Sequence, residues 1–462
     1  MSTLTVNFTN HSGIQDTVLI SIGFFQGSPT AGQQAIPFSI INLKDQSVIN
    51  PLDDGSGTYP KNGNWYTLDR LAEGVSISSF SGRIYVCYGN AWIIQYKNYE
   101  PGQAVTDPNF YLRYDKMEIT FTGSPNDVAD LTSIDYWSIP MTLSTYLSTK
   151  SKTSPVQTVT GLLNGTTAEK IYTVLNALST PPVSAIAGPG GTDGAPMPSL
   201  VPGSYQQFGT GPSPMSSFAR IIGPSSYPAI LPLPGGIPVQ PYDLFNDYLA
   251  YLNATFGPGT TISASIVGLG NGVIALIQGQ FAGVGSPPPS TGPQSRQQYS
   301  LTAVINSNYD IVLTGSVGGA NTTMLYTYAS LINPTGIYGG NAPFYLNSST
   351  TQTAPANDVY GWIGGDLFSG FNIGAIGSTT KINDSMVGAM PSQSWFTIKP
   401  ENFFGGLQTR PNFFNQWAAT LAQLSQAYNF AFTDRFAHVL TSLNPATVDT
   451  LEIVLEDTSE IS

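Results

Sequence analysis

The chain has 462 residues, and 41% of them are hydrophobic, so it can bury a sizeable core and is not a disordered chain. Only 10% are charged, against roughly 25% in an average soluble domain, and small or neutral polar residues take their place. The formal net charge is −12 and no run of Lys and Arg occurs, which argues against a nucleic-acid binder.

The cysteine and histidine content argues against a cross-linked or zinc-binding protein. Cys87 is the single cysteine, so no disulfide can form within the chain. It lies in an apolar run, where we expect it to be a small buried side chain. The two histidines, His11 and His438, lie far apart, and no Cys/His cluster could bind zinc. We expect no metal and no cofactor.

The first 140 residues have the pattern of β-structure. The stretch from Leu4 to Phe8 alternates like a strand and does not have the pattern of a secretory signal. Turn clusters such as Asp53–Gly57 separate the apolar runs, and short strands at this spacing are typical of a sandwich or barrel. The further strands are predicted at Thr17–Phe24, Gln34–Leu43 and Val75–Tyr88.

After Pro140 the pattern becomes mixed. Thr166 to Glu169 has the spacing of a capping box and leads into apolar residues that share one helical face. A second helix is expected around Leu244 to Leu252, after a loop rich in Gly and Pro at 181–214. Strands are then predicted at 262–267, 273–281, 299–305 and 311–317.

The C-terminal part is expected to hold one helix and one strand. The stretch from Gly336 to Pro400 is rich in Gly, Asn, Ser and Thr, and it predicts short strands at best. A last helix is predicted to start at Pro411 and to place Trp417 and Leu421 on one face. No 18 consecutive apolar residues occur, so no membrane-spanning helix is expected.

Five short passages carry a family resemblance, in this order: Val6–Asn10, Ser81–Tyr85, Tyr114–Phe121, Leu131–Pro140 and Ala427–Asp434. Together they resemble glycoside hydrolase family 64, whose members contain a thaumatin-like β-sandwich. The second passage is similar to the family's SGRIYF-type strand, the third to its FDWVEFT-type segment and the fourth to its TTQVDMF-type segment. The resemblance covers roughly the first 145 residues and the last 50. The middle matches only loosely, for example at Phe218–Ile222.

The resemblance implies a mainly β fold with some α. We expect a thaumatin-like antiparallel β-sandwich or barrel, plus an inserted mixed α/β domain. Residues 1–148 would form the first part of the sandwich, 149–409 the inserted domain, and 410–462 the C-terminal helix and strands that complete the sandwich. In the family, the substrate groove runs between two such domains.

The resemblance also assigns two catalytic carboxylates, Glu118 and Asp135. Hydrolysis of a glycosidic bond needs an acid for the leaving oxygen and a second carboxylate that activates water or attacks the sugar. Strand alternation places Glu118 and Thr120 on one face, opposite Met117 and Ile119. Glu118 would be the general acid, its pKa raised by partial burial and by the charge of Asp135. Asp135 would be the base that holds water, and the resemblance implies inversion.

The predicted site also includes substrate-binding residues and alternative residues for the general base. The candidate substrate-binding residues are Thr120, Trp137, Tyr136 and Tyr114, although aromatic residues on strands more often belong to the core. The interval from Glu118 to Asp135 is one residue longer than the family pattern, and the family's groove tryptophan is replaced by Asp127 and Val128. The nearby alternatives for the base are Asp115, Asp127 and Asp130.

The function implied by the resemblance is a β-1,3-glucanase. Its partner would be a β-1,3-glucan polysaccharide of the laminarin or curdlan type, and the resemblance implies an extracellular protein. The alternative is a non-catalytic carbohydrate-binding or structural surface protein on the same scaffold, because a fold does not dictate a function. The sequence predicts neither product length nor oligomeric state.

Overall fold

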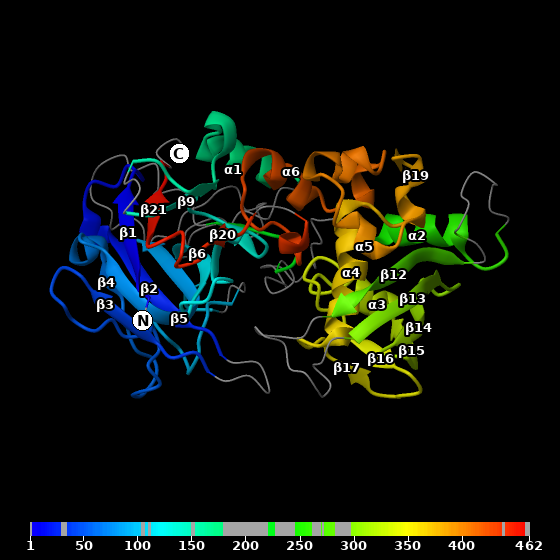
Figure 1. The fold of residues 1–462 in the computed structure, drawn as a ribbon, viewed down its shortest axis with the longest axis horizontal. Coiled ribbons are helices and arrows are strands. Elements are labelled where there is room, and N and C mark those ends of the chain that lie inside the picture. The colour runs from blue at the N-terminus through cyan, green and yellow to red at the C-terminus, as the bar shows by residue number, and fades with distance from the viewer. Residues whose placement is uncertain are drawn as a thin grey trace. The chain divides into compact units, whose positions relative to one another are not determined.

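The computed structural model describes residues 2–28, 35–102, 107–109, 112–148, 153–178, 220–226, 245–260, 269, 272–281, 297–436 and 439–457 (Figure 1). The chain forms two compact units. Unit 1 comprises Met1–Tyr242, Thr420–Asn429 and His438–Ser462, and unit 2 comprises Asp243–Ala419 and Phe430–Ala437. The predicted strand at 262–267 and the predicted loop at 181–214 lie outside the described residues.

The boundaries of the two units differ from the domain boundaries expected at residues 148 and 410. Unit 1 continues past 148 because β10 (Gln157–Thr160) pairs with β9 (Met141–Tyr146), and β11 (Ile221–Ile222) pairs with β8 (Tyr136–Trp137). The chain then crosses between units within α6 (Gln416–Leu424). Strand pairing across long sequence separations therefore sets the division of the chain.

Unit 1 is built on a large, nearly closed sheet. Among the described residues this sheet has 11 strands, and its main order is β10-β9-β21-β1-β5-β6-β7-β20, with β2 and β3 on β5 and β4 on β2. The strands not yet given are β1 (Leu4–Asn10), β2 (Ile20–Gln26), β3 (Ser39–Asn42), β4 (Tyr66–Thr67), β5 (Val75–Tyr88), β6 (Arg113–Phe121), β7 (Val128–Leu131), β20 (Thr441–Ser442) and β21 (Thr450–Leu455).

One side chain links the two ends of this strand order. The Gln157 amide at the start of β10 donates to the carbonyl of Leu440 at 2.8 Å and accepts from the backbone N–H of Ser442 in β20 at 3.0 Å. These two bonds satisfy backbone groups that a free sheet edge would leave unpaired. The sheet therefore comes close to a closed barrel.

The two ends of the chain meet in the middle of the sheet. β1 pairs with β21 in parallel, with Val6 opposite Leu451 and Phe8 opposite Ile453, and Figure 1 shows the blue and red strands side by side. Alternate residues of β21 are fully buried, as the period of a half-buried strand requires. The final strand is thus a central member of the sheet.

β5 joins two parts of the sheet. Its first residues pair with β1 and β3, and its second half pairs with β2 and β6. Gly82 lies between these halves, where an added Cβ would stand 2.0 Å from the carbonyl oxygen of Phe25. Only glycine permits this close approach of two strands. The Ser81-Gly82-Arg83 passage therefore has a structural reason for its glycine.

One strand and one helix begin later than the sequence predicts, because the residues before them form a cap or a turn. Residues Thr17–Leu19 form a 3-10 turn, capped by the Asp16 carboxylate, so β2 begins at Ile20. Thr167 caps α1 (Ala168–Asn176) by accepting from the N–H of Lys170 at 3.2 Å. The helix thus begins one residue later than a capping box from Thr166 to Glu169 predicts.

Unit 2 contains a six-stranded antiparallel sheet among its described residues. The strands follow one another in chain order, as an antiparallel meander does. β12 and β14 have the predicted bounds, whereas β13 begins two residues before the prediction. They are β12 (Val273–Phe281), β13 (Gln297–Ile305), β14 (Ile311–Val317), β15 (Ala320–Tyr326), β16 (Phe344–Leu346) and β17 (Gln352–Thr353).

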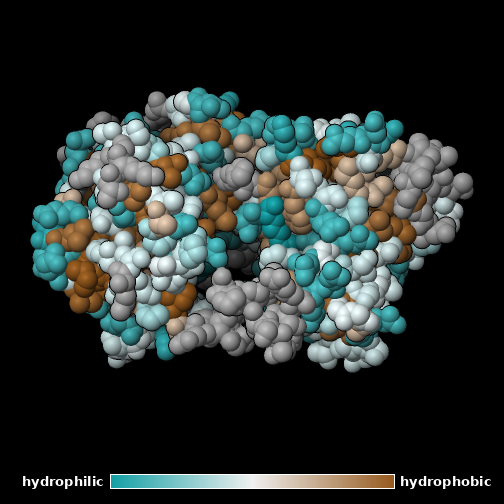
Figure 2. Space-filling view, viewed as in Figure 1, coloured by the Kyte–Doolittle hydropathy of each residue, from teal (hydrophilic) through white to brown (hydrophobic). Residues whose placement is uncertain are grey.

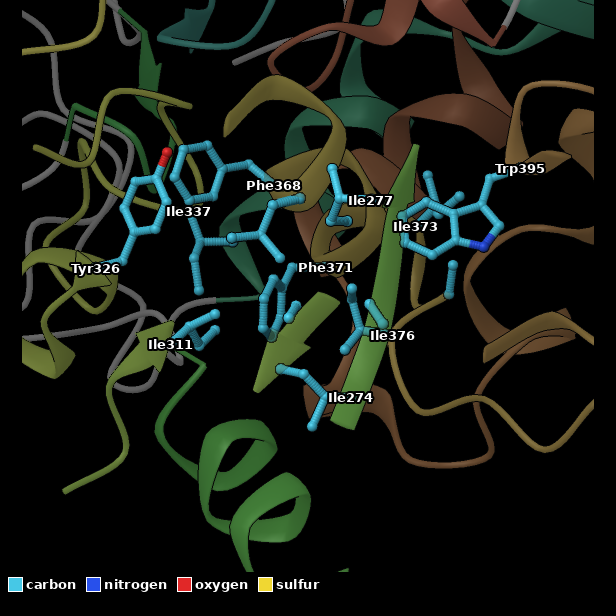
Figure 3. Packing of buried hydrophobic residues seen from close by; sticks show 14 of the residues in the cluster. Ile274, Ile277, Ile311, Tyr326, Ile337, Phe368, Phe371, Ile373, Ile376 and Trp395 are labelled. Carbon is cyan, nitrogen blue, oxygen red and sulfur yellow. The ribbon is translucent and has the colours of Figure 1, made fainter. Parts of the chain in front are cut away.

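The expectation of short strands at best between Gly336 and Pro400 is wrong. This stretch contains α4 (Val359–Ile373), a 15-residue helix with residues buried on every side. A helix that is apolar all round shows no amphipathic period. Its glycines permit close packing: a Cβ on Gly370 would stand 2.4 Å from the Trp395 ring. Figure 3 shows Phe368 and Phe371 of α4 among buried isoleucines, of which Ile274, Ile277 and Ile311 lie on strands of the sheet.

The remaining helices of unit 2 are short. The last predicted helix does not start at Pro411, because Pro411–Phe413 is a 3-10 turn and the Asn415 side chain caps α6 by accepting from the N–H of Ala418 at 2.9 Å. The others are α2 (Asn246–Phe256), α3 (Tyr328–Leu331) and α5 (Ser392–Trp395), with a small hairpin of β18 (Lys381–Ile382) and β19 (Ser385–Met386).

A buried ion pair ties the segment 430–437 into unit 2. Arg435 donates to Asp366, whose side chain has no solvent exposure and also accepts from Tyr299 at 2.7 Å and Ser392 at 2.8 Å. A Cβ on Gly365 would stand 2.8 Å from Arg435, so glycine makes room for the guanidinium. A buried carboxylate with this many donors is fully paired, as burial requires.

The surface reflects the low charge of the sequence. On the face shown in Figure 2, pale residues of intermediate hydropathy cover much of the area, and brown residues are interspersed among them. No helix among the described residues is long and apolar enough to cross a membrane.

We expect Ile453→Ala to destabilise unit 1 strongly. Ile453 is fully buried in β21, so the change leaves a cavity and should cost about 2–5 kcal/mol of unfolding free energy. The control is Val454→Ala on the partly exposed face of the same strand, with a cost of less than about 1 kcal/mol. Denaturant unfolding measures both, and equal costs would contradict the central place of β21.

Candidate active site

Charged side chains gather on one face of β5, β6 and β7. Arg83 of β5 lies opposite Glu118 of β6, and Glu118 lies opposite Asp130 of β7. Tyr85 lies opposite Lys116 in the next row. Residues directly opposite in an antiparallel pair share a face, and alternate residues of one strand do so too. These five side chains therefore lie on one face.

Glu118 is a half-exposed carboxylate next to an arginine. Its side chain is 43% exposed, and the Nε of Arg83 donates to its Oε1 at 2.9 Å. The same guanidinium also binds Glu100 through a second nitrogen, and the Tyr85 hydroxyl donates to Glu100 at 2.5 Å. Burial would raise the pKa of Glu100, but Arg83 and Lys116 outweigh it and hold that pKa below its ordinary value.

Asp135 is held by a lysine and a serine. Lys116 donates from Nζ to one carboxylate oxygen at 2.7 Å, and Ser226 donates from Oγ to the other at 3.1 Å. The charge of Lys116 outweighs burial and lowers the pKa of Asp135 below its ordinary value. With 39% of its side chain exposed, Asp135 is an ionised carboxylate that water can reach.

The segment 220–226 fixes the loop that carries Asp135. The N–H of Gly223 donates to the carbonyl of Asp135 at 2.8 Å, and the hydroxyl of Ser225 donates to the carbonyl of Ile134 at 2.9 Å. A Cβ on Gly223 would stand 2.5 Å from that same Ile134 oxygen. Backbone and side-chain contacts from this distant segment thus position the candidate base.

Asp115 lies on the opposite face of β6 and holds the backbone that follows β8. It is 3% exposed and accepts the N–H groups of Ser138 and Ile139 at 2.8 Å each. Burial raises its pKa to about 7, although these hydrogen bonds partly offset the effect. Asp115 faces the interior, so its position favours a structural role over that of an alternative base.

The other two alternatives for the base differ in position. Asp127 is 3% exposed and accepts the N–H groups of Thr122 at 2.7 Å and Ser124 at 2.8 Å, so it shapes the turn between β6 and β7. Asp130 lies directly opposite Glu118 on the shared face. Of the three alternatives, Asp130 is therefore the one whose position suits chemistry next to Glu118.

The predicted substrate-binding residues fall into two groups. Thr120 lies on the face of Glu118, with its hydroxyl 2.8 Å from that of Ser81. Tyr114, Tyr136 and Trp137 are 1%, 4% and 2% exposed, and the first two rings meet edge to face at 5.3 Å. Their burial favours a packing role, and stacking on a sugar stays a prediction.

The structure brings the two predicted catalytic carboxylates into one charged cluster. Lys116 binds Asp135 and lies two residues from Glu118 on the same face of β6, and Arg83 acts electrostatically on both carboxylates. Arg83 lies in a passage that carries the resemblance, and alternation could have placed Lys116 beside Glu118. No sequence signal pointed to Glu100, or to Ser226, which lies 91 residues from Asp135.

No protein-family model and no curated protein sequence matches this chain. Among solved structures, a laminaripentaose-producing β-1,3-glucanase in complex with laminaritetraose aligns over 99% of both chains, with 15% identity and a TM-score of 0.52. A family 64 β-1,3-glucanase domain from Clostridium beijerinckii aligns over 98% of both chains, with 12% identity and a TM-score of 0.48. The chain thus has a fold like that of the laminaripentaose-producing β-1,3-glucanase, and the expected mainly β class with some α is confirmed.

We expect Asp115→Asn to change how stability depends on pH. The folded-state pKa of Asp115 is raised to about 7, so its stabilising contribution is complete below the unfolded pKa and is lost as pH rises to 7. The stability of the wild type relative to the variant should therefore fall between about pH 4 and 7, with a slope of about 1.4 kcal/mol per pH unit.

Urea unfolding across this pH range measures the difference. Asp449→Asn is the control, because hydrogen bonds from Ser148 outweigh burial and lower the pKa of Asp449, so its contribution is lost only as pH falls below the unfolded pKa and stays nearly constant between about pH 5 and 7. A wild type and an Asp115→Asn variant with parallel pH profiles would show that Asp115 does not titrate as its burial requires.

Proposed function

We propose that this chain is a glycoside hydrolase that cleaves β-1,3-glucan with Glu118 as general acid and Asp135 as general base. The main support is one observation: two partly exposed carboxylates in different surroundings lie in one charged cluster. Pairs of carboxylates with distinct environments are what glycosidases use. The substrate class follows from the structural neighbour, a β-1,3-glucanase in complex with laminaritetraose.

The proposed reaction is an inverting hydrolysis. The Asp135 carboxylate accepts a proton from water while the water oxygen bonds to the anomeric carbon. Glu118 gives its proton to the glycosidic oxygen as the bond from that oxygen to the anomeric carbon breaks. Asp135 then carries the proton, Glu118 is ionised, and both exchange with solvent before the next cycle.

The surroundings of Asp135 suit this role. Lys116 keeps the carboxylate ionised, and Lys116 and Ser226 each bind a different oxygen, which fixes its orientation. A base that cannot rotate freely holds its water in one place, which raises the effective concentration of the nucleophile. Glu118 retains an exposed side chain, which a sugar oxygen can approach.

One observation favours the alternative of a non-catalytic carbohydrate-binding or structural protein. Each candidate carboxylate has a cation within hydrogen-bonding distance, Arg83 for Glu118 and Lys116 for Asp135. Ion pairs of this kind are also found on structural sheet faces. Under this alternative, the chain binds insoluble β-1,3-glucan or assembles without releasing sugar, and Glu118→Gln leaves binding unchanged.

We expect Glu118→Gln and Asp135→Asn each to lower the release of reducing ends from laminarin about 10²–10⁴-fold, because each removes one proton-transfer group. Asp130→Asn is the matched control on the same face, and it should keep activity within about tenfold of the wild type. Circular dichroism and thermal unfolding check that every variant folds.

The configuration of the first products tests the stereochemistry. Inversion at a β-linked glucan gives α-anomers, which proton NMR detects before they mutarotate. Loss of activity in Asp130→Asn with an active Asp135→Asn would assign the base to Asp130. A folded wild type that binds curdlan but releases no sugar would support the non-catalytic alternative.

A further inference from the structure

One arginine serves two carboxylates in the candidate site. Arg83 donates from Nε to Glu118 at 2.9 Å, and another nitrogen of the same guanidinium binds Glu100. The two bonds use different nitrogens of one planar group, so a shift toward one carboxylate weakens the bond to the other. The guanidinium therefore couples Glu118 to a residue 18 positions earlier in the chain.

Glu100 is a well-fixed partner for this arginine. Its side chain is 32% exposed, and the Tyr85 hydroxyl donates to the same carboxylate oxygen that Arg83 binds, at 2.5 Å. Tyr85 is 2% exposed and packs against Trp92 with ring centroids 4.3 Å apart. A buried hydroxyl on a packed ring thus holds Glu100 in place beside the guanidinium.

The proposed reaction requires Glu118 to be protonated, and the arrangement of Arg83 and Glu100 allows this. A general acid must carry a proton, whereas an adjacent cation favours the ionised carboxylate. Arg83 therefore has to leave Glu118 before the proton is delivered to a glycosidic oxygen. Glu100 offers the guanidinium a second carboxylate at hydrogen-bonding distance, so Arg83 can leave Glu118 without becoming unpaired.

We propose that Glu100 is a positioning residue, which draws Arg83 away from Glu118 so that Glu118 can carry the proton of the reaction. This inference rests on the proposed function and deepens it. Glu100 acts through Arg83 and does not touch the reacting atoms. The proton on Glu118 comes from solvent, and Arg83 stays charged throughout because its pKa lies far above neutral.

Several charged groups share the surroundings of Glu118. Arg83 faces it from β5 and Asp130 from β7, while Lys116 lies on its own strand. Glu100 and Asp135 come from loops and bind Arg83 and Lys116. Glu100 binds Arg83, which is also the cation bound to Glu118, whereas Asp135 binds Lys116.

The test is the pH dependence of laminarin hydrolysis by Glu100→Gln. Without the charge of Glu100, Arg83 stays with Glu118 and the acid loses its proton more readily. The alkaline limb of the kcat/KM profile should move to lower pH by about one pH unit, the size of a single charge effect. Above that limb, activity should fall about tenfold, and KM should change little. Arg83→Gln should move the limb to higher pH.

The double variant separates action through Arg83 from a direct charge effect. With Arg83→Gln present, adding Glu100→Gln should leave the alkaline limb in place, because the cation that carries the coupling is gone. The control is Glu73→Gln, an exposed carboxylate elsewhere in unit 1. An unshifted limb in Glu100→Gln, or an equal shift in the Arg83→Gln background, would overturn the inference.

A second readout keeps this inference distinct from the proposed function. Carboxyl carbon NMR, with Glu118→Gln for assignment, reports the titration midpoint of Glu118 without any substrate. The same downward movement of the midpoint in Glu100→Gln is expected there. An inactive wild type overturns the proposed function, whereas an active wild type with an unmoved midpoint in Glu100→Gln overturns the role of Glu100 alone.

Discussion

The pairing of β5 with β6 is the constraint on which the candidate site depends. Nine residue pairs, from Phe80–Phe121 to Tyr88–Arg113, fix the register between these strands. A slip of β6 by one residue would turn Lys116 and Glu118 to the opposite face, away from Arg83, and bury two charges. Gly82 permits the neighbouring pairing of β5 with β2, because the two backbones approach closely there.

The two faces of β6 carry residues with different roles in the candidate site. Lys116 and Glu118 point to the charged face, where Arg83 and Asp135 meet them. Asp115 points to the other face and binds the backbone N–H groups of Ser138 and Ile139, which follow β8. One strand thus carries both the candidate acid and the lysine that binds the candidate base.

Within each unit, contacts between residues far apart in sequence stabilise the fold, and no disulfide contributes. In unit 1, β1 pairs with β21, and the Gln157 side chain joins β10 to β20. In unit 2, the buried pair of Asp366 and Arg435 binds a C-terminal segment to the long glycine-rich helix. Each contact joins residues far apart in sequence, so both units depend on non-local contacts, which form late because loop closure costs entropy.

The sequence by itself determined the mainly β class and the positions of the longer strands, such as β5, β12 and β14, because strand alternation is local. Short motifs that carry the family resemblance predicted the two candidate carboxylates. It did not predict α4, whose glycines and all-round burial erase the helical period. Only the tertiary structure placed Glu100 and Ser226 beside Arg83 and Asp135. The tertiary structure also placed a cation beside each candidate carboxylate, Arg83 beside Glu118 and Lys116 beside Asp135. The charges around a residue depend on side chains from distant parts of the sequence, which only the fold brings together.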